Sequence, residues 1–361
     1  MRAAIMRNQR LIVDEIAVPA PGPGEVLVKT LACGICGSDL HALAHAELLV
    51  DGARRSGGPF VMELNRDIVM GHEFCAEVVD FGPATSRRLA AGQRICSLPI
   101  LIRGTQLQTV GYSNDHPGGY GEYMRLNEAL LLAVPNGLST AHAALTEPMA
   151  VGVHAVAKAR MEADDVPLVV GCGPVGLAVI AALKLAGIAP IVAADYSARR
   201  RELALIMGAD VVVDPGVDSP FASWREAALW RDPAQAPPQP PWVPGPPVRP
   251  AVIFECVGVA GMIDQVMVGA APGARIVVVG VCMQRDHIEP MFGINKELNV
   301  QFVLGYTADE FAATLRHIAE GDIAVAPLIT GTVGVNGVAA AFVELASPEQ
   351  HAKILVEPWH D

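Results

Sequence analysis

Hydrophobic positions in residues 166–195 fall in the order strand, helix, strand. The apolar run at 168–170 predicts a buried parallel strand, because strands covered on both faces are apolar throughout. An apolar helix is predicted from 174 to 186, and Gly187 supplies its stop signal. A second strand at 191–194 leads into Asp195. This order predicts the opening unit of a doubly wound α/β domain.

Three glycines follow the first strand in the spacing G-x-G-x-x-G, and the third of them falls in the first turn of the predicted helix. In this spacing they permit a tight turn, a close backbone approach to a pyrophosphate, and close packing of helix on strand. The free N–H groups at the start of the helix attract the same anion. An acidic residue that ends the second strand accepts hydrogen bonds from an adenosine ribose. We therefore predict a dinucleotide site formed by Gly171, Gly173, Pro174, Val175, Gly176 and Asp195.

Asp195 also bears on which dinucleotide binds. Its charge repels the 2′-phosphate of NADP and so favours NAD, although an arginine in 199–201, such as Arg200, is able to hold that phosphate. The glycine loop alone leaves a flavin open. A membrane span is rejected, because Lys184 and the glycines interrupt an apolar run that would need about 20 residues.

Patterns elsewhere in the chain predict further elements, some in this domain and some outside it. Residues 1–32 alternate polar and apolar positions between Pro/Gly turns, which predicts antiparallel strands. A helix is predicted at 306–321, with a capping box formed by Thr307 and Glu310. The proline-rich tract 233–250 reads as a surface insertion. Further elements of the α/β domain are a helix at 199–207 and strands at 211–213, 253–257, 276–281 and 299–304, which bring the parallel sheet to six strands.

Composition narrows the class of protein. A chain of 361 residues is long enough for two domains with substantial cores. A net charge of −12 argues against nucleic acid and anionic membranes as partners. The first residues do not read as a cleavable signal, and seven cysteines are an odd number. We therefore expect a cytoplasmic protein whose cysteines act as ligands or packing residues.

Four segments carry residues suited to metal chemistry, namely C-G-I-C-G-S-D-L-H at 33–41, G-H-E at 71–73, G-G-Y-G-E-Y at 118–123 and L-T-E-P at 145–148. Catalytic zinc takes thiolate, imidazole and carboxylate ligands and leaves one position open. Cys36 and His72 supply the first two kinds. Cys33 and Cys36 also form C-x-x-C, so a redox pair or half of a structural zinc site is an alternative. Because the other cysteines are widely scattered, we favour a packing role for Cys33.

Together with the glycine loop, these segments resemble the zinc-dependent medium-chain alcohol and polyol dehydrogenases. The resemblance runs the length of the chain, as far as A-K-I-L-V at 352–356. It implies that the third zinc ligand is Glu147, as in the polyol branch of the family. Glu73 is its competitor, and the two ligands could exchange.

The resemblance also implies roles for polar residues near the metal. Asp39 would accept the second ring N–H of His72 and fix its tautomer. Ser38 would take the proton from the alcohol, and His41 would pass it onward near the cofactor ribose. The alternative is that Ser38 and His41 are ordinary polar residues of a loop.

Two departures from the family pattern are visible. Many relatives carry four closely spaced cysteines after the G-H-E segment, whereas residues 96–117 contain only Cys96. We therefore expect one catalytic zinc per subunit and no structural zinc. The second departure is a long stretch at 42–67, which we expect to form a helix and a loop over the mouth of the active site.

These observations lead to one expected architecture and function. The fold is a mostly β GroES-like catalytic domain (1–150 and 304–361) with a six-stranded Rossmann domain (151–303) inserted in it. The resemblance implies a zinc-dependent oxidoreductase that transfers hydride between NAD and a small-molecule alcohol, a secondary alcohol or polyol, or the matching carbonyl. A homodimer or homotetramer is also implied, with the strands at 276–281 and 299–304 at the interface. The alternatives are a zinc-free quinone-type NADPH reductase and a non-catalytic NAD-binding protein.

Overall fold

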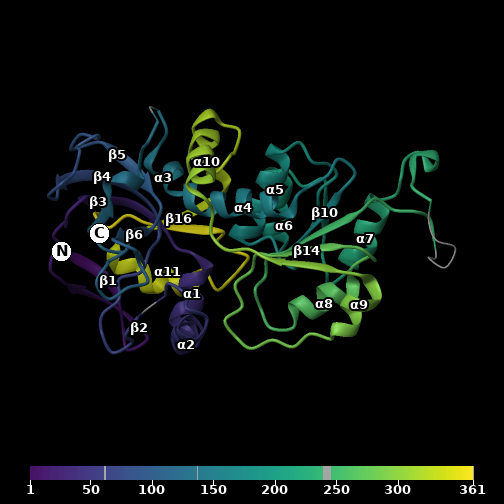
Figure 1. Cartoon of the computed structure of the whole chain (residues 1–361), viewed down its shortest axis with the longest axis horizontal. Coiled ribbons are helices and arrows are strands. Elements are labelled where there is room, and N and C mark those ends of the chain that lie inside the picture. Colours follow the sequence, from purple (N-terminus) through teal and green to yellow (C-terminus); the bar gives the residue numbers. More distant parts are fainter. Residues whose placement is uncertain (61, 136, 239–244, 361) are drawn as a thin grey trace. The chain divides into compact units, whose positions relative to one another are not determined.

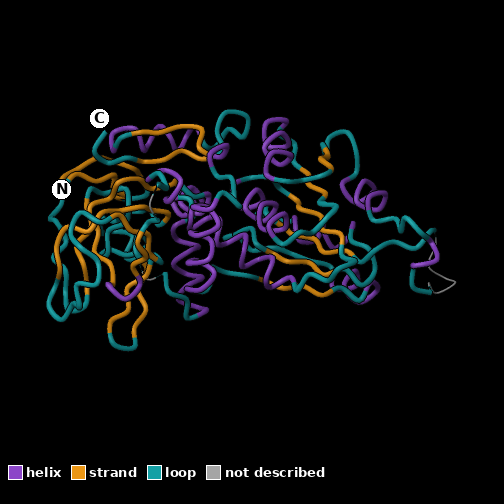
Figure 2. The backbone as a smooth tube through the Cα atoms, turned by 90° about the horizontal axis from the view of Figure 1, so that it is seen from above, coloured by secondary structure: helices purple, strands orange, loops and turns teal. Residues whose placement is uncertain are grey.

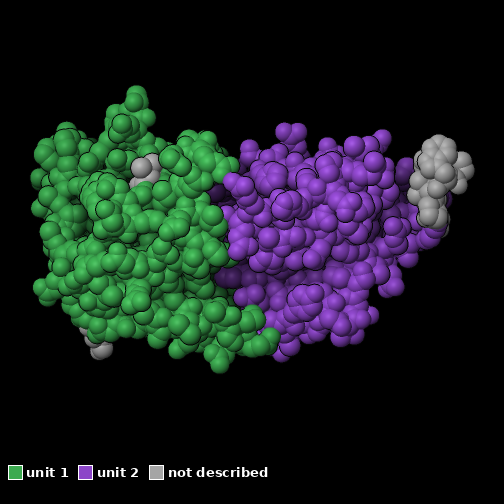
Figure 3. Space-filling model, turned by 90° about the horizontal axis from the view of Figure 1, so that it is seen from below, with its two compact units in different colours: residues 1–148, 307–361 green, residues 149–306 purple. Residues whose placement is uncertain are grey.

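The computed structural model describes residues 1–60, 62–135, 137–238 and 245–360. The chain forms two compact units, Met1–Pro148 with Thr307–Asp361, and Met149–Tyr306 (Figure 3). Part of the predicted proline-rich insertion, residues 239–244, lies outside the described residues. Among the described helices, none combines the length and the apolar character that crossing a membrane requires.

The unit Met149–Tyr306 is built on one parallel sheet of six strands in the order β12-β11-β10-β13-β14-β15. The central strand β10 comes first in this unit, and the chain winds outward from it in both directions. This topology confirms the predicted doubly wound fold. The strands are β10 (Val166–Val170), β11 (Val192–Ala194), β12 (Val211–Val213), β13 (Ala251–Glu255), β14 (Arg275–Val278) and β15 (Asn299–Phe302).

Helices cover both faces of this sheet, with α5 and α6 on one side and α8 and α9 on the other (Figure 1). The apolar strands therefore lie in a buried core in which Val166, Leu168, Ile253 and Ile276 are almost inaccessible to water. The helices are α4 (Thr146–Ala159), which begins in the other unit, α5 (Pro174–Leu185), α6 (Ala198–Met207), α7 (Pro220–Ala227), α8 (Met262–Gly269) and α9 (Pro290–Lys296).

Three strands of this sheet end earlier than the apolar pattern predicts: β15 ends at Phe302, and loop contacts account for the early ends of β13 and β14. β13 ends at Glu255, whose side chain accepts hydrogen bonds from the N–H groups of Val257 and Gly258. The backbone carbonyl of Glu255 accepts hydrogen bonds from the N–H groups of Val279 and Gly280, just after β14 ends. A tight loop contact therefore replaces the last expected residues of β13 and β14.

The other unit is a mostly antiparallel β structure that holds both termini (Figure 2). Its main sheet has the order β16-β17-β3-β4-β5-β9, and β8 also pairs with β3. Separate two-stranded sheets are formed by β1 with β2 and by β6 with β7. The strands are β1 (Arg2–Arg7), β2 (Arg10–Glu15), β3 (Glu25–Gly34), β4 (Glu73–Phe81), β5 (Arg94–Ser97), β6 (Ile100–Arg103), β7 (Gln106–Thr109), β8 (Tyr123–Asn127), β9 (Leu131–Ala133), β16 (Ile329–Val333) and β17 (Lys353–Val356).

The helices of this unit are α1 (Gly37–Ala44), α2 (Ala46–Ser56), α3 (Thr140–Ala144), α10 (Ala308–Glu320) and α11 (Val338–Glu344). The predicted helix and loop at 42–67 correspond to the end of α1, α2 and the chain that follows. The capping box of α10 is present, because Thr307 and Glu310 each accept a hydrogen bond from the other's backbone N–H. In place of a cysteine-rich lobe, the chain after β5 forms the β6–β7 hairpin.

Candidate active site and metal centre

The C-x-x-C segment lies at a strand-to-helix junction. β3 ends at Gly34, and Cys36 is the N-cap residue of α1. The backbone N–H of Cys36 donates to the Asp39 carboxylate at 3.1 Å, which fixes the first turn of the helix. Cys33 is fully buried and packs against backbone near Gly71 and Gly119, and all cysteines in the described structure are free thiols.

His72 and Glu73 reach the same place from the start of β4. The preceding Gly71 has a φ of +102° and is packed so tightly that a Cβ there would lie 2.9 Å from the Cys33 sulfur. Only glycine fits at position 71, where the backbone passes close to Cys33, and this close approach brings His72 beside α1.

Cys36, His72 and Glu73 form one group of potential ligands in the described structure, with a sulfur, a ring nitrogen and a carboxylate oxygen all within 4.8 Å of one another. This is a donor set that zinc accepts. The His72 Nδ1 atom is buried without a hydrogen-bond partner and lies 3.4 Å from the Asp39 Oδ1 atom. The thiol, imidazole and nearby carboxylates therefore suit a cation at this point.

The charges around His72 and Asp39 also favour a positive charge at this site. Burial disfavours the charged form of His72, but Asp39 and Cys36 outweigh it and raise its pKa well above the usual value. Burial likewise opposes ionisation of Asp39, yet His72 and hydrogen bonds from Tyr120 and Tyr112 lower the pKa of this carboxyl group. The buried Asp39 carboxylate is thus kept ionised by its neighbours.

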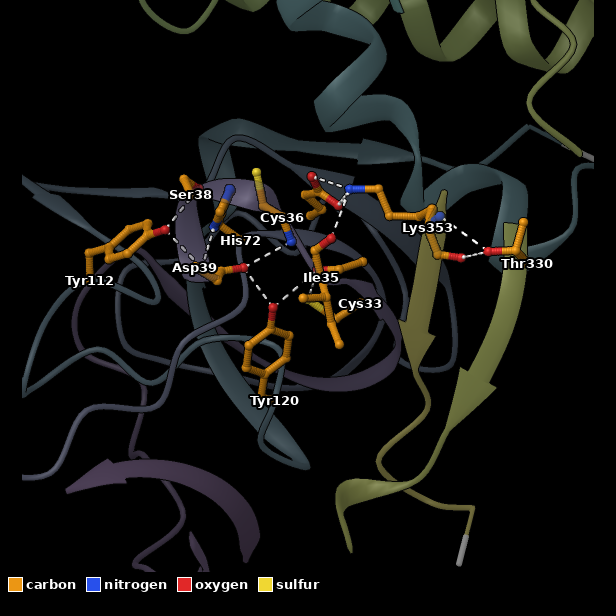
Figure 4. A network of polar contacts seen from close by, with 12 residues as sticks. Cys33, Ile35, Cys36, Ser38, Asp39, His72, Tyr112, Tyr120, Thr330 and Lys353 are labelled. Carbon is orange, nitrogen blue, oxygen red and sulfur yellow. Dashed lines mark hydrogen bonds and ion pairs between the residues drawn. The ribbon is translucent and has the colours of Figure 1, made fainter. Parts of the chain in front are cut away.

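Asp39 is the centre of a hydrogen-bond network (Figure 4). Tyr112 donates to its Oδ1 atom at 2.8 Å, and Tyr120 donates to its Oδ2 atom at 2.6 Å. The Tyr112 hydroxyl is also 2.9 Å from the hydroxyl of Ser38. Neither tyrosine was among the predicted site residues: Tyr120 stands in the G-G-Y-G-E-Y segment but was given no role, and nothing in the local pattern of Tyr112 distinguishes it from a core aromatic.

A buried ion pair adjoins the metal group. Lys353 donates from Nζ to both carboxylate oxygens of Glu73, at 2.8 and 2.7 Å, and to the carbonyl oxygen of Ile35 at 3.0 Å. Burial disfavours the ammonium ion, but Glu73 more than compensates, so the pKa of Lys353 is raised. Lys353 was not among the predicted site residues, although a lone lysine inside the apolar strand K-I-L-V indicates that a buried acid must be near.

Two other predicted residues lie in the same unit. Glu147 is nearly buried in the first turn of α4 and is close enough to Lys353 to contribute to its raised pKa, but it is not part of the 4.8 Å group. His41 is one helical turn after Ser38 on α1, and burial together with His45 lowers its pKa.

The glycine loop of the other unit has the geometry that its spacing predicts. Gly171 has a φ of +90°, Gly173 is the N-cap of α5, and Pro174 is its first residue. A Cβ on Gly176 would overlap the carbonyl oxygen of Gly171, so this position packs α5 against the loop. A Cβ on Gly173, by contrast, would have open space beside it: apart from its own neighbours in the chain, the nearest atom would be Arg200 Nη1 at 3.8 Å.

Asp195 closes this loop from the end of β11. Its carboxylate accepts hydrogen bonds from the backbone N–H groups of Cys172 and Ser197, each at 2.8 Å. Arg200 lies 3.8 Å from the Asp195 Oδ2 atom, and its Nε atom is buried without a hydrogen-bond partner. The loop thus offers backbone donors, a carboxylate and a guanidinium around the start of α5.

One unit is a six-stranded domain of the kind that binds dinucleotides, and the β unit carries a group of sulfur, nitrogen and oxygen ligands. This combination is that of a metal-dependent dehydrogenase. Comparison with known proteins agrees. Residues 22–136 match the model of the alcohol dehydrogenase GroES-like domain, and residues 174–320 match that of the zinc-binding dehydrogenases. The chain belongs to the zinc-dependent medium-chain alcohol and polyol dehydrogenase family and is an oxidoreductase.

Individual relatives cover nearly the whole chain. It is 32% identical to the (R,R)-butanediol dehydrogenase of Bacillus subtilis, over 99% of this chain and 100% of that protein. The crystal structure of 2R,3R-butanediol dehydrogenase from Bacillus subtilis superposes with a TM-score of 0.78 at 30% identity and covers 99% of both chains. The sorbitol dehydrogenase of Bos taurus is 28% identical, over 91% of this chain and 90% of that protein.

Proposed function

We propose that the protein oxidises a secondary alcohol or polyol with NAD as the hydride acceptor, at one zinc ion held by Cys36, His72 and a carboxylate. The observation that carries the proposal is the convergence of Cys36, His72 and Glu73 within 4.8 Å, next to Ser38 and Asp39. Zinc at such a site acts as a Lewis acid that lowers the pKa of an alcohol.

The chain's own residues then handle the proton. Ser38, at the start of α1, accepts it from the alcohol, and His41 receives it one turn further along the same helix. The lowered pKa of His41 keeps this ring neutral near pH 7, which is the state that accepts a proton. Asp39, tied to two tyrosines and to the backbone of Cys36, orients His72.

Glu147 is our proposed third protein ligand. Glu73 is closer to Cys36 and His72, but both of its oxygens accept hydrogen bonds from Lys353. If Glu73 moved away to bind zinc, the buried Lys353 ammonium would lose its counter-ion, which is unfavourable. Glu147→Gln should therefore lower zinc affinity or turnover about ten-fold or more, because a neutral amide is a poorer ligand than a carboxylate. If Glu147→Gln has no effect and Glu73→Gln does, the third ligand is Glu73.

NAD is the proposed cofactor because Asp195 occupies the end of β11. Its carboxylate partly neutralises Arg200, the guanidinium that would otherwise hold a 2′-phosphate. Asp195→Gly should weaken NAD binding about ten- to a hundred-fold, by the loss of a charged hydrogen bond to ribose, and improve NADP relative to the wild type. A wild-type preference for NADP would contradict this role of Asp195.

The substrate class follows from the family members that are named for a diol and for a polyol. We expect turnover to fall in the order 2,3-butanediol or sorbitol, then 2-butanol, then ethanol. Absorbance of NADH, measured over this panel with NAD in excess, tests the order. Turnover of ethanol above all secondary alcohols would contradict it.

A homo-oligomer is proposed through the edge strand β15. Of the two strands expected at an interface, β14 is paired on both sides and buried, so it offers no edge. All four residues of β15 are exposed, and Phe302 and Leu304 are 64% and 71% exposed. An unprotected apolar edge invites strand pairing with a second copy. Light scattering on the wild type and Val300→Lys tests this, because the variant should shift toward monomer.

A further inference from the structure

The Tyr112 hydroxyl has a defined direction of hydrogen bonding. A tyrosine hydroxyl has one proton, and here Asp39 Oδ1 accepts it at 2.8 Å. Asp39 also accepts from Tyr120 and from the backbone N–H of Cys36, which is the pattern of an ionised carboxylate that has no proton to give back. The second contact of Tyr112, to the Ser38 hydroxyl at 2.9 Å, must therefore be one in which Ser38 donates.

This direction decides what Ser38 offers to a substrate. Its single proton points at Tyr112, so both oxygen lone pairs are free to face other groups. A serine held in this way accepts a hydrogen bond from the alcohol, as is required of a residue that receives its proton. When that proton arrives, the proton that Ser38 already carries must leave, and because Tyr112 keeps its own proton on Asp39, the Ser38 hydroxyl turns away from Tyr112 and passes its proton toward His41. Without Tyr112, the hydroxyl would rotate and could equally present its proton to the alcohol oxygen.

Tyr112 is itself held firmly. The Thr109 hydroxyl donates to the Tyr112 carbonyl oxygen at 3.0 Å. The adjacent Gly111 has a φ of +88°, and a Cβ there would lie 3.0 Å from the backbone of Gly71. The Tyr112 ring makes a T-shaped contact with Phe60 and a tilted contact with the His72 ring, each with a centroid distance of 5.4 Å. The side chain comes from the hairpin region that replaces the cysteine-rich lobe, so the resemblance gave no guide to it.

We propose that Tyr112 is a positioning residue that holds the Ser38 hydroxyl as an acceptor for the substrate alcohol. The inference rests on the proposed function of Ser38. It separates Tyr112 from Tyr120, which also donates to Asp39 but has no contact with Ser38 among the hydrogen bonds of the described structure (Figure 4).

A double-mutant cycle tests the proposal. Tyr112→Phe should lower kcat with 2,3-butanediol about three- to ten-fold, the size of one lost hydrogen bond, with a smaller change in KM. In the Ser38→Ala background, Tyr112→Phe should have almost no further effect, because there is no hydroxyl left to orient. Tyr120→Phe is the matched control, and its effect should be the same in both backgrounds. An equal Tyr112→Phe loss with and without Ser38 would overturn the proposal.

The same cycle can be read without turnover. Calorimetry measures the affinity of the enzyme–NAD complex for trifluoroethanol, and a hydrogen bond from this alcohol to Ser38 contributes to that affinity. Tyr112→Phe should weaken the affinity only when Ser38 is present. If the wild type neither oxidises alcohols nor binds trifluoroethanol, the proposed function fails. If the wild type does both and the coupling is zero, only the role of Tyr112 fails.

A measurement on the wild type keeps the proposal testable if Tyr112→Phe does not fold. Neutron diffraction of deuterated crystals locates the hydroxyl deuterons directly. We expect the Ser38 deuteron on the line to Tyr112 Oη and the Tyr112 deuteron on the line to Asp39. A Tyr112 deuteron directed at Ser38 would overturn the proposal.

Discussion

Lys353 and Glu73 form an ion pair across 280 positions of sequence, and both side chains are almost inaccessible to water. Removing one partner from such a pair leaves an uncompensated buried charge, which typically costs about 3–5 kcal/mol. At the scale of the residue, this pair therefore connects the stability of the catalytic unit to the metal group beside it.

Lys353→Met should lower the free energy of unfolding by about 3–5 kcal/mol in urea denaturation, and adding Glu73→Gln should restore part of the loss. Arg54→Met is a matched control, because its ion pair with Asp51 is largely exposed and should contribute less than about 1 kcal/mol. Equal effects of Lys353→Met and Arg54→Met would show that the buried pair has no special weight.

His116 predicts a pH dependence of stability. Its ring is buried, contacts Gln108 and lies 3.0 Å from an Arg125 nitrogen. Burial, followed by Arg125 and Arg103, lowers its pKa to about 4. As pH falls from about 6.5 toward 4, His116 becomes protonated in the unfolded chain but stays neutral in the folded chain. The folded state therefore loses stability over this pH range and regains it as pH rises.

The expected loss from His116 is on the order of 1–2 kcal/mol, because solvent in the adjoining surface pocket screens part of the effect. Urea denaturation of the wild type and His116→Gln at pH 7 and pH 4.5 measures it. His360→Gln, in an exposed ring, is the control and should keep the wild-type slope. A His116→Gln protein whose stability depends on pH as steeply as the wild type's would show that His116 is not the source of the effect.

At the scale of the element, the turn from β10 into α5 is the part that the sequence predicts best. Its glycines, N-cap and proline act within six residues, so local spacing carries their roles. The capping box of α10 is equally local. Strand ends are different, because β13 and β14 end where Glu255 makes hydrogen bonds to a neighbouring loop.

Gly176→Ala tests the role of this turn. The added Cβ would overlap the Gly171 carbonyl oxygen, so the loop must move away from α5. The backbone N–H groups of the loop would then no longer point at the cofactor's pyrophosphate. We expect NADH affinity to fall at least about ten-fold and stability to fall by about 1–3 kcal/mol. Gly187→Ala, just after α5, is the control: its φ of +72° makes alanine costly for stability, but NADH affinity should not change. Unchanged NADH affinity in Gly176→Ala would contradict the role of the turn.

At the scale of the whole molecule, the division into two units and the doubly wound sheet follow from periodicity and motif order. The ligand group was predictable only in part. Cys36, His72 and Glu73 stand in recognisable segments. Lys353 reaches the group through the pairing of β17 with β3, and Tyr112 comes from the chain that follows β7, so the local pattern gave neither residue a role. Long-range packing, rather than local spacing, places such residues.

The proposed function depends on a single zinc ion held through Cys36. A second group of potential ligands in the described structure, His317, Glu320 and Asp322, is more exposed and should release a metal readily on dialysis. The control for Cys36→Ala is Cys282→Ala, a free thiol in the other unit. Both variants should retain NADH binding, because neither residue belongs to the glycine loop.

Elemental analysis of the dialysed proteins is the most direct measurement. We expect one zinc per chain in the wild type and in Cys282→Ala, and close to none in Cys36→Ala together with loss of turnover. Full zinc content and activity in Cys36→Ala would contradict this expectation. So would two tightly held zinc ions, or none, in the wild type.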